Sequence, residues 1–371
     1  MRLAYLHSGS IPSVYANGVH VMRMCDAFTE AGHEVTLYAL PGSVRTEDVY
    51  DYYGVRHRFP IHTIGAPSIA LLGMGIRALR VRGDIRRRGR PDLAYGRDLY
   101  SLVAMSDLGP LVYETHLLWD DRVWRWLERR LFRARTLQRV VTVSAMLADD
   151  YRQAFPELDS VDLLVAPDGA DPPKPACAAV CLPGRPEAVK IGYVGHLYPG
   201  RGIDVILDLA GRLPALDFHL VGGTSEDRSH WEQRSSHPNV YFHGHQPPAA
   251  LGPYYRSFEI VLAPYQTKVA CAGGIGDISR WTSPMKLFEY MAQGRAIIAS
   301  DLPVLREVLT DRVNCLLCPP GDLSGWEAAI TELATDRELR RSLGTEAQHQ
   351  LLTRYTWRQR VDRVLPSLSA P

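Results

Sequence analysis

The chain has 371 residues, 46% of them hydrophobic and 22% charged, which predicts a folded globular protein of two domains. Its 42 basic residues against 41 acidic ones give a net charge of +1, and this balance disfavours a general nucleic-acid-binding protein, which depends on neutralising phosphates. Six cysteines are too few for a secreted disulfide scaffold, and no apolar run forms a signal peptide or reaches the roughly 18 residues of a spanning helix. We therefore expect a cytoplasmic protein.

The first half of the chain alternates short β-branched runs with helical stretches, a pattern typical of a parallel sheet covered by helices. The first strand is expected at residues 3–6, followed by a polar turn over 7–18 and a helix that stops at Gly32. Further strands are expected at 34–38, 92–95, 111–113, 139–143 and 162–165. The pattern predicts a doubly wound domain over residues 1–170.

A proline-rich segment over residues 171–189 is unsuited to a helix or a central strand, and we interpret it as a hinge between domains. A second doubly wound domain is expected over 190–352, and a C-terminal helix over 353–371 whose return to the first domain the sequence leaves open. The strands of this second domain are expected at 190–194, 218–221, 240–242, 260–262, 296–298 and 315–317. The predicted fold class is α/β, with two Rossmann-like domains facing across a cleft at the carboxyl ends of their strands.

Two segments of the second half carry a resemblance to a known family: GHLYPGRGID over residues 195–204 and SPMKLFEYMAQG over 283–294. They resemble the retaining glycosyltransferases of family 4, which have the GT-B fold. The likeness continues through 299–307, 314–322 and 355–357 and, more loosely, through 16–21 and 32–35. It implies transfer of a sugar from a UDP- or GDP-linked donor to a small-molecule or glycan acceptor, without a metal or other cofactor.

The resemblance places the donor in the second domain. Arg201, in a glycine-flanked turn, stands at the family's lysine position, and Lys286 lies just inside a helix; both are expected to stabilise the leaving diphosphate. Glu289 is expected to accept hydrogen bonds from the ribose hydroxyls. Ordinary surface roles are the alternative for Arg201 and Glu289. The other donor residues that the resemblance implies are Gly18, His196, Ser283, Met285 and Leu287, with Gly244, His245 and Pro264 in the base-binding turns.

The sequence departs from the family at two positions. Trp281 stands where the family has a glutamate that contacts the donor sugar, and its only polar group is a donor N–H. Asp277, in the glycine-rich loop 273–277, is the candidate substitute, and an unusual donor is the alternative. His196 stands at a common arginine position, and histidine is fully charged only below about pH 6.5, so diphosphate affinity is expected to be weaker or pH-dependent.

In the first domain the resemblance places His116 on the donor sugar, with a structural histidine as the alternative. Glu114 and His20 are acceptor candidates, with a position facing the core as the slightly less favoured alternative for His20, and Gly18 either approaches a phosphate or serves a turn. No essential protein base is expected, because a retaining enzyme of this family is thought to pass the acceptor proton to the departing diphosphate. Ser144 is expected to cap a helix.

Other readings of the sequence are weaker. Cys315 and Cys318, with Cys177 and Cys181, have metal-ligand spacing, but the first two fall on an apolar strand. No glycine-rich dinucleotide fingerprint follows the first strand, which argues against a nicotinamide enzyme.

A basic amphipathic helix is expected over residues 120–139, and packing on its own sheet is favoured over weak peripheral contact with a membrane, an option that the seven arginines of 77–90 keep open. Its arginine stripe consists of Arg122, Arg125, Arg129 and Arg133.

The rival functions are a nucleotide-sugar epimerase or hydrolase of the same fold and a catalytically silent partner subunit. The sugar, the base, the acceptor and the oligomeric state stay open.

Overall fold

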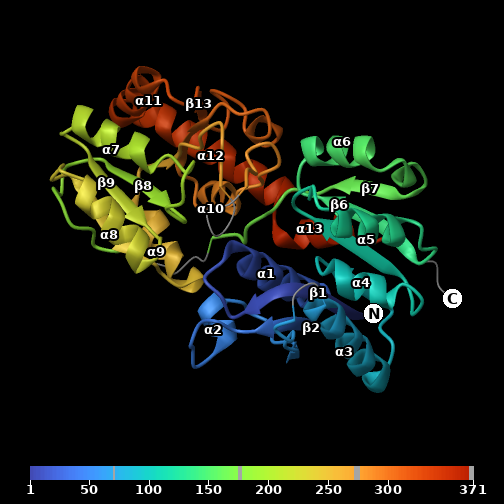
Figure 1. The fold of residues 1–371 in the computed structure, drawn as a ribbon. Helices are drawn as coiled ribbons and strands as arrows, with labels where there is room; N and C mark the ends of the chain where they lie inside the picture. The colour runs from blue at the N-terminus through green and yellow to red at the C-terminus, as the bar shows by residue number, and fades with distance from the viewer. Residues whose placement is uncertain (70–71, 174–177, 271–275, 367–371) are drawn as a thin grey trace. The chain divides into compact units, whose positions relative to one another are not determined.

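The computed structural model describes residues 1–69, 72–173, 178–270 and 276–366. The chain forms two compact units, the first from Met1–Pro167 and Trp357–Pro371 and the second from Asp168–Thr356. In Figure 1 the chain runs from blue to red, and the red helix α13 (Trp357–Val364) lies with the blue and green elements of the first unit. Each unit is a parallel sheet flanked by helices.

The first unit has a seven-stranded sheet of order β3-β2-β1-β4-β5-β6-β7, in which every pairing is parallel. Its strands are β1 (Arg2–Ile11), β2 (Glu34–Pro41), β3 (Ile61–Thr63), β4 (Leu93–Gly96), β5 (Leu111–Thr115), β6 (Leu137–Thr142) and β7 (Asp162–Val165). Its other helices are α1 (Ala16–Glu30), α2 (Val49–Tyr53), α3 (Gly73–Arg88), α4 (Leu99–Met105), α5 (Arg122–Phe132), α6 (Ala145–Ala154) and the 3₁₀-helix η1 (Pro156–Ser160). The order reverses between β1 and β4, where ligands bind in sheets of this kind.

The second unit has a six-stranded parallel sheet of order β10-β9-β8-β11-β12-β13. Its strands are β8 (Lys190–Val194), β9 (Asp217–Val221), β10 (Val240–Gly244), β11 (Ile260–Ala263), β12 (Ala296–Ser300) and β13 (Leu316–Cys318). Its helices are α7 (Ile203–Arg212), α8 (Ser225–Arg234), α9 (Leu251–Ser257), α10 (Met285–Ala292), α11 (Leu323–Thr335) and α12 (Arg337–Arg354), with 3₁₀-helices η2 (Pro248–Ala250) and η3 (Leu305–Glu307). The prediction of two parallel α/β sheets is confirmed.

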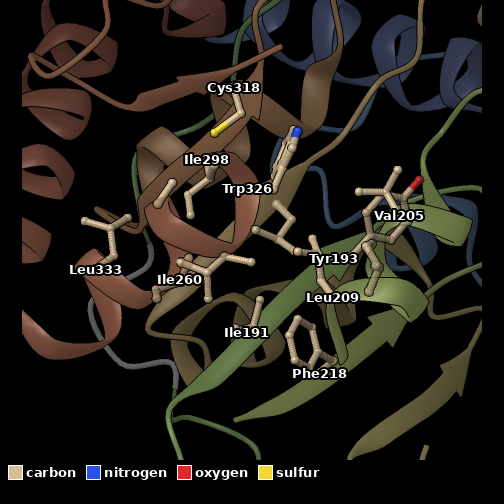
Figure 2. Packing of buried hydrophobic residues seen from close by; sticks show 14 of the residues in the cluster. Ile191, Tyr193, Val205, Leu209, Phe218, Ile260, Ile298, Cys318, Trp326 and Leu333 are labelled. Carbon is tan, nitrogen blue, oxygen red and sulfur yellow. The ribbon is translucent and has the colours of Figure 1, made fainter. Parts of the chain in front are cut away.

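The core of the second unit joins its sheet to the helices beside it. Ile191 of β8 and Phe218 of β9 belong to one buried cluster with Leu209 of α7 and Trp326 of α11, as Figure 2 shows. Each of these side chains is at most 1% exposed. Removal of so much apolar surface from water fixes β8 and α7, and with them the turn between the two, which carries Arg201.

Several predicted boundaries are wrong. The polar turn expected over 7–18 is strand as far as Ile11, because β1 pairs with β2 again at Ser10 and Ile11 after an irregularity. The helix expected over 120–139 ends at Phe132, and β6 begins at Leu137 after a short turn. The described residues of 171–189 contain neither helix nor strand, and Gly32 ends its helix with a φ of +86° as predicted. Among the described helices, none has the length and apolar character needed to span a membrane.

Candidate functional site

Arg201 lies in a turn whose two flanking positions require glycine. Gly200 and Gly202 flank it with φ of +82° and +75°, and a Cβ on either would collide with a backbone carbonyl oxygen, that of Lys268 or of Pro264. Gly202 is also the N-cap of α7. The glycine-flanked turn predicted before a helix is therefore present and rigid.

The Arg201 guanidinium lies over the ring of Tyr265, 5.2 Å from its centroid, and donates to the Ala270 carbonyl at 3.4 Å. Its Nε is buried and has no hydrogen-bond partner among the described residues. This side chain keeps most of its hydrogen-bonding capacity for a ligand.

Lys286 is the second residue of α10 and is only 9% exposed. Its Nζ lies 3.8 Å from the centroid of the Tyr193 ring and 5.3 Å from that of Tyr265. Within the described part of the chain Nζ is buried and has no hydrogen-bond partner. Gly195, after β8, makes the room, since a Cβ there would lie 2.7 Å from Nζ. The result is a buried ammonium group against two aromatic rings.

Burial and then the nearby Arg201 charge hold the pKa of Lys286 well below its ordinary value, although Glu289 opposes the shift. Burial, followed by the charges of Arg201 and Lys286, lowers the pKa of His196 to about 4. Three predicted donor residues are thus electrostatic neighbours. His196 is neutral at pH 7, so it offers a hydrogen bond and not a charge.

Glu289 lies one turn after Lys286, and its Oε2 accepts a hydrogen bond from the Tyr255 hydroxyl at 2.5 Å. The helix itself is fixed by Tyr290, whose hydroxyl accepts from the Val194 N–H at 2.9 Å and donates to the Leu262 carbonyl at 3.3 Å. These bonds hold α10 against the ends of β8 and β11.

The remaining donor candidates have mixed surroundings. The Ser283 hydroxyl accepts from the Asp168 N–H at 3.0 Å, Leu287 is buried, and Met285 is the first residue of α10. Gly244 ends β10 with a φ of +67°, and His245 is exposed beside it. Pro264 packs against Gly202 at the end of β11. These turns lie at the carboxyl edge of one sheet.

The Asp277 carboxylate bonds the backbone of its own loop. Its Oδ1 accepts the backbone N–H groups of Val269 and Ser279, both at 2.9 Å, so it organises its own loop. Trp281 follows in the same turn, and its backbone N–H donates to the Ile278 carbonyl. Residues 273–275 of the predicted glycine-rich loop lie outside the described residues.

Gly18 is the third residue of α1, so it lies at the start of a helix as predicted. It is buried where a Cβ would lie 2.8 Å from the hydroxyl oxygens of Ser13 and Tyr53, and its N–H donates to the Tyr15 carbonyl. Close packing accounts for glycine at this position. Ser144 caps α6 as predicted, accepting from the Leu147 N–H at 3.2 Å.

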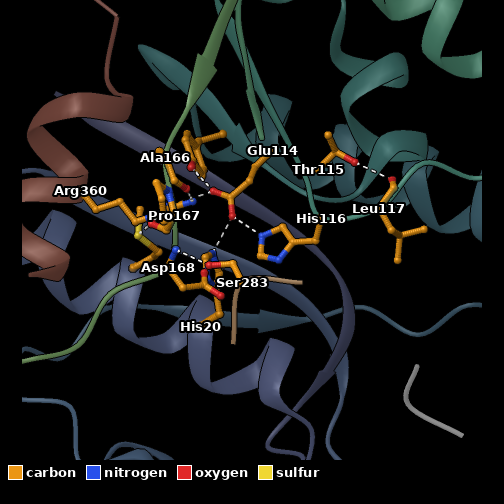
Figure 3. A network of polar contacts seen from close by, with 12 residues as sticks. His20, Glu114, Thr115, His116, Leu117, Ala166, Pro167, Asp168, Ser283 and Arg360 are labelled. Carbon is orange, nitrogen blue, oxygen red and sulfur yellow. Dashed lines mark hydrogen bonds and ion pairs between the residues drawn. The ribbon is translucent and has the colours of Figure 1, made fainter. Parts of the chain in front are cut away.

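Glu114 is the centre of a buried polar network in the first unit. Its Oε1 lies 2.7 Å from Nε2 of His20 and 2.6 Å from Nε2 of His116. Its Oε2 accepts from Arg360 at 3.1 Å and from the Tyr95 hydroxyl. Figure 3 shows the carboxylate with both imidazoles and the Arg360 guanidinium directed at it.

The electrostatics of this network follow from that geometry. Burial raises the pKa of Glu114, but Arg360 and the histidines outweigh it, so the net pKa lies well below the ordinary value. Burial and the Arg97 charge lower the pKa of His116 to about 4, against the opposing effect of Glu114. Glu114 is thus a permanent anion, and His116 is a neutral imidazole at pH 7.

The ligand atoms of His20, Glu114 and His116 lie within 4.8 Å of one another, close enough to hold a metal ion. Both imidazole nitrogens are already bonded to one carboxylate oxygen, and the Arg360 charge opposes a second cation there. Cys315 and Cys318 donate to backbone carbonyls, and burial first of all raises each pKa to about 12, which disfavours the thiolates that metals bind. Cys177 lies outside the described residues, and Cys181 is exposed.

Sequence reasoning missed the contacts of three residues that complete these arrangements: Tyr193 and Tyr265 beside the cations, and Arg360 beside Glu114. Each was hidden by its surroundings in the sequence, since the tyrosines lie on or beside apolar strands and Arg360 lies in an arginine-rich C-terminal helix. Arg360 stands beside the apolar residues Trp357 and Val361, which are buried. An arginine on the apolar side of a helix is the sequence signal that could have indicated a buried ion pair.

Comparison with known proteins gives consistent results. Residues 18–174 match the family model for Glycosyltransferase Family 4, and residues 188–336 match that for Glycosyl transferases group 1. The chain is 26% identical over 353 residues to a phosphatidyl-myo-inositol mannosyltransferase of Mycolicibacterium smegmatis, covering 91% of this chain and 86% of the relative. It is 27% identical to a GDP-mannose-dependent alpha-mannosyltransferase of the same organism, covering 96% and 94%.

Among solved structures, the Anabaena protein HepE in complex with UDP-glucose superposes with a TM-score of 0.71 at 15% identity, covering 98% of each chain. At this identity the likeness shows the GT-B fold alone. The two family matches together span most of the chain and both units. The protein is therefore a glycosyl-transferring enzyme that belongs to glycosyltransferase family 4.

Proposed function

We propose that the chain is a retaining, metal-independent glycosyltransferase whose donor is a nucleoside diphosphate sugar bound by the second unit. The observation that carries the proposal is the buried Lys286 ammonium beside Arg201. A buried cation without a counterion is costly, and a diphosphate supplies the missing negative charge. Its oxygens also gain charge as the sugar leaves, which is where fixed cations lower a barrier.

The base of the donor is uracil or guanine. One relative is named as GDP-mannose-dependent and one structural neighbour was solved with UDP-glucose, so each nucleotide has a precedent. Mannose is the first sugar to test, because two relatives are named as mannosyltransferases.

The chemistry that the first unit offers supports the proposal of retention. In this mechanism the bond from the anomeric carbon to the diphosphate breaks, the acceptor oxygen adds on the same face, and its proton passes to the departing phosphate oxygen. Glu114 is neutralised by Arg360 and engaged by two imidazoles, which makes it a poor base. We assign it to the orientation of His116, whose neutral imidazole can bond a sugar hydroxyl.

Weak contact with an anionic membrane is a separate proposal, carried by α5. Leu127 and Leu131 of this helix are buried, while Trp126 is 60% exposed and the neighbouring Trp119 43% exposed. Arg122 and other arginines of the helix are exposed as well. A basic helix with outward tryptophans suits a lipid headgroup region.

The test of the donor proposal is calorimetric titration of UDP and GDP into the wild-type chain and into Glu289→Ala. Loss of the carboxylate should weaken nucleotide binding by about 1.5–3 kcal/mol, because a charged hydrogen-bonding group is removed. Tyr255→Phe is the matched control, since it deletes the neighbour's hydroxyl and keeps the carboxylate. Full activity in EDTA and an α-linked product from an α-linked donor would support the mechanism; a β-linked product would overturn retention.

A further inference from the structure

We propose that the first unit holds a phosphate group of the acceptor at the carboxyl end of β4, beside the middle of β1, with Arg97 as its charged anchor and His7 as a second donor. The proposal rests on the proposed function and names the acceptor class: a phosphorylated compound, either soluble or a lipid headgroup.

The position of Arg97 is fixed by its backbone. It follows Gly96, the last residue of β4, where a Cβ would collide with the Leu6 carbonyl of β1. The N–H groups of Arg97 and Asp98 both donate to that carbonyl, at 2.9 and 3.1 Å. Arg97 therefore lies where the strand order reverses, between β1 and β4.

The charge of Arg97 has no counterion among the described residues. The adjacent Asp98 is buried and forms an ion pair with Arg77, and Glu114 forms an ion pair with Arg360. No side-chain hydrogen bond or ion pair of the described residues involves the Arg97 guanidinium, which is partly buried. With the other charges at this edge paired, one positive charge is left over. An anionic ligand is the partner that this arrangement lacks.

His7 supplies the second, independent observation. It is 2% exposed, and within the described residues neither of its ring nitrogens has a hydrogen-bond partner. Gly9 gives the ring its space, because a Cβ there would lie 2.5 Å from Nε2. A buried imidazole with two unsatisfied nitrogens is costly unless a ligand bonds it.

The backbone N–H of Arg97 donates to the carbonyl of Leu6, the residue before His7, so the two residues meet at the same point of the sheet. Burial is the largest cause that lowers the pKa of His7, and the Arg97 charge is the next; the same two causes lower the pKa of His116. One guanidinium thus acts on both imidazoles. The Arg97 guanidinium and the His7 imidazole together offer several N–H donors, and these suit the three free oxygens of a phosphate better than the two oxygens of a carboxylate.

The test uses the full chain saturated with UDP or GDP, so that the donor cations are occupied, and methyl phosphate as the probe. Methyl phosphate should bind the wild type, and Arg97→Gln should raise its dissociation constant at least tenfold. Arg97→Lys should recover part of the loss. Arg90→Gln, which removes an exposed charge from the same unit, is the matched control and should leave the constant unchanged.

Two further measurements sharpen the result. The imidazole NMR signals of His7 should shift on addition of methyl phosphate in the wild type, and much less in Arg97→Gln. Vesicles of phosphatidylcholine with phosphatidylglycerol distinguish the sources: a lipid headgroup is indicated if vesicle binding also falls in Arg97→Gln, and a soluble phosphate ester if it does not. Acetate in place of methyl phosphate tests a carboxylate; tighter binding of acetate would overturn the assignment.

Equal methyl phosphate affinity in wild type and Arg97→Gln overturns the inference, as does the absence of methyl phosphate binding together with vesicle binding independent of Arg97. The proposed function fails differently, by the absence of UDP and GDP binding in the wild type. In that case methyl phosphate binding is compared between Lys286→Met and the double variant that also carries Arg97→Gln. Because Lys286→Met lacks one of the donor cations, a loss of binding in the double variant reports on Arg97, and the two failures are distinguished.

Discussion

At the scale of single residues, Lys286 shows a conflict between stability and binding. Its ammonium group is buried without a counterion among the described residues, so the native state bears a cost that the unfolded chain avoids. Lys286→Met fills nearly the same volume without the charge. We expect it to raise the free energy of unfolding by about 1–3 kcal/mol at pH 7 while it weakens nucleotide binding at least tenfold.

Chemical denaturation and calorimetry on the same preparation check both halves of that prediction. Lys190→Met is the contrasting variant, because Lys190 is paired with Asp217 at 2.7 Å and its loss should destabilise the fold. A destabilised Lys286→Met with unchanged nucleotide affinity would contradict the account of this site.

The lowered pKa of Lys286 also predicts that nucleotide binding takes up protons. Burial and Arg201 favour the neutral amine in the free protein, and a bound diphosphate favours the charged form. By the same linkage, the unfolded chain binds more protons than the native one below the ordinary lysine pKa, so this group makes stability rise with pH. Titrations of UDP or GDP in buffers of different ionisation enthalpy measure the uptake, which should vanish in Lys286→Met.

The sequence was informative for residues within a motif and silent on their partners. Arg201, Lys286 and Glu289 stand in short local patterns, and the structure brings the first two together. The aromatic pocket of Tyr193 and Tyr265 joins residues more than 20 positions from Lys286, and no local pattern encodes such a contact. Glu114 is bonded by Arg360, which lies 246 positions away, and nothing near Glu114 in the sequence indicates this pairing. The sequence therefore suggested Glu114 as an acceptor ligand.

At the scale of elements, α5 carries a buried acid on its inner face. Glu128 accepts from the hydroxyls of Tyr113 at 3.1 Å and Tyr151 at 2.5 Å, and burial raises its pKa to about 7 despite these bonds. Between pH 4.5 and 7 the unfolded chain loses this proton and the native chain keeps it, so stability falls as pH rises through this window.

Glu128→Gln removes that dependence. We expect the variant to match the wild type near pH 4.5 and to exceed it by about 3 kcal/mol above pH 7, since one pKa unit corresponds to about 1.4 kcal/mol. Urea denaturation across this pH range measures the difference. Glu157→Gln, at an acid paired with Arg133 near the surface, should show no such gain, and an equal gain there would point to net charge instead.

The outer face of α5 makes a separate prediction about membranes. Trp126→Ala should lower binding to phosphatidylglycerol-containing vesicles several-fold, because an exposed tryptophan contributes apolar area at the headgroup boundary. Val313→Ala, at an exposed apolar residue of the second unit, is the control. Co-sedimentation measures the effect, and equal loss in both variants would exclude a specific role for α5.

Element boundaries were predicted best where burial and turn chemistry agree. β7 and β8 have the predicted limits. Gly32, which follows the end of α1, has a backbone conformation in the left-handed region, as predicted. β3 was missed because three residues without a buried pattern give no periodic signal. The helix over 120–139 was drawn too long because arginines continue past Phe132, and helical arginine spacing cannot mark where the backbone turns.

At the scale of the whole molecule, the second unit is one continuous stretch inserted into the first. The first unit is completed only by α13, whose Trp357 and Val361 are buried and whose Arg360 bonds the carbonyls of Ala166 and Pro167 as well as Glu114. Residues 168–356 should therefore fold alone, whereas residues 1–167 should be largely unfolded by circular dichroism, with Glu114 left without its cation.

Adding a peptide of residues 357–366 should restore the native spectrum of 1–167, since it returns both the apolar side chains and the charge. The matched peptide with Arg360→Met keeps the apolar face and should bind at least a hundredfold more weakly, because a buried carboxylate that loses its partner costs about 3–5 kcal/mol. Native spectra for 1–167 without any peptide would contradict this account. Equal binding of the two peptides would mean that α13 acts through its apolar surface alone and that the ion pair to Glu114 does not hold the first unit together.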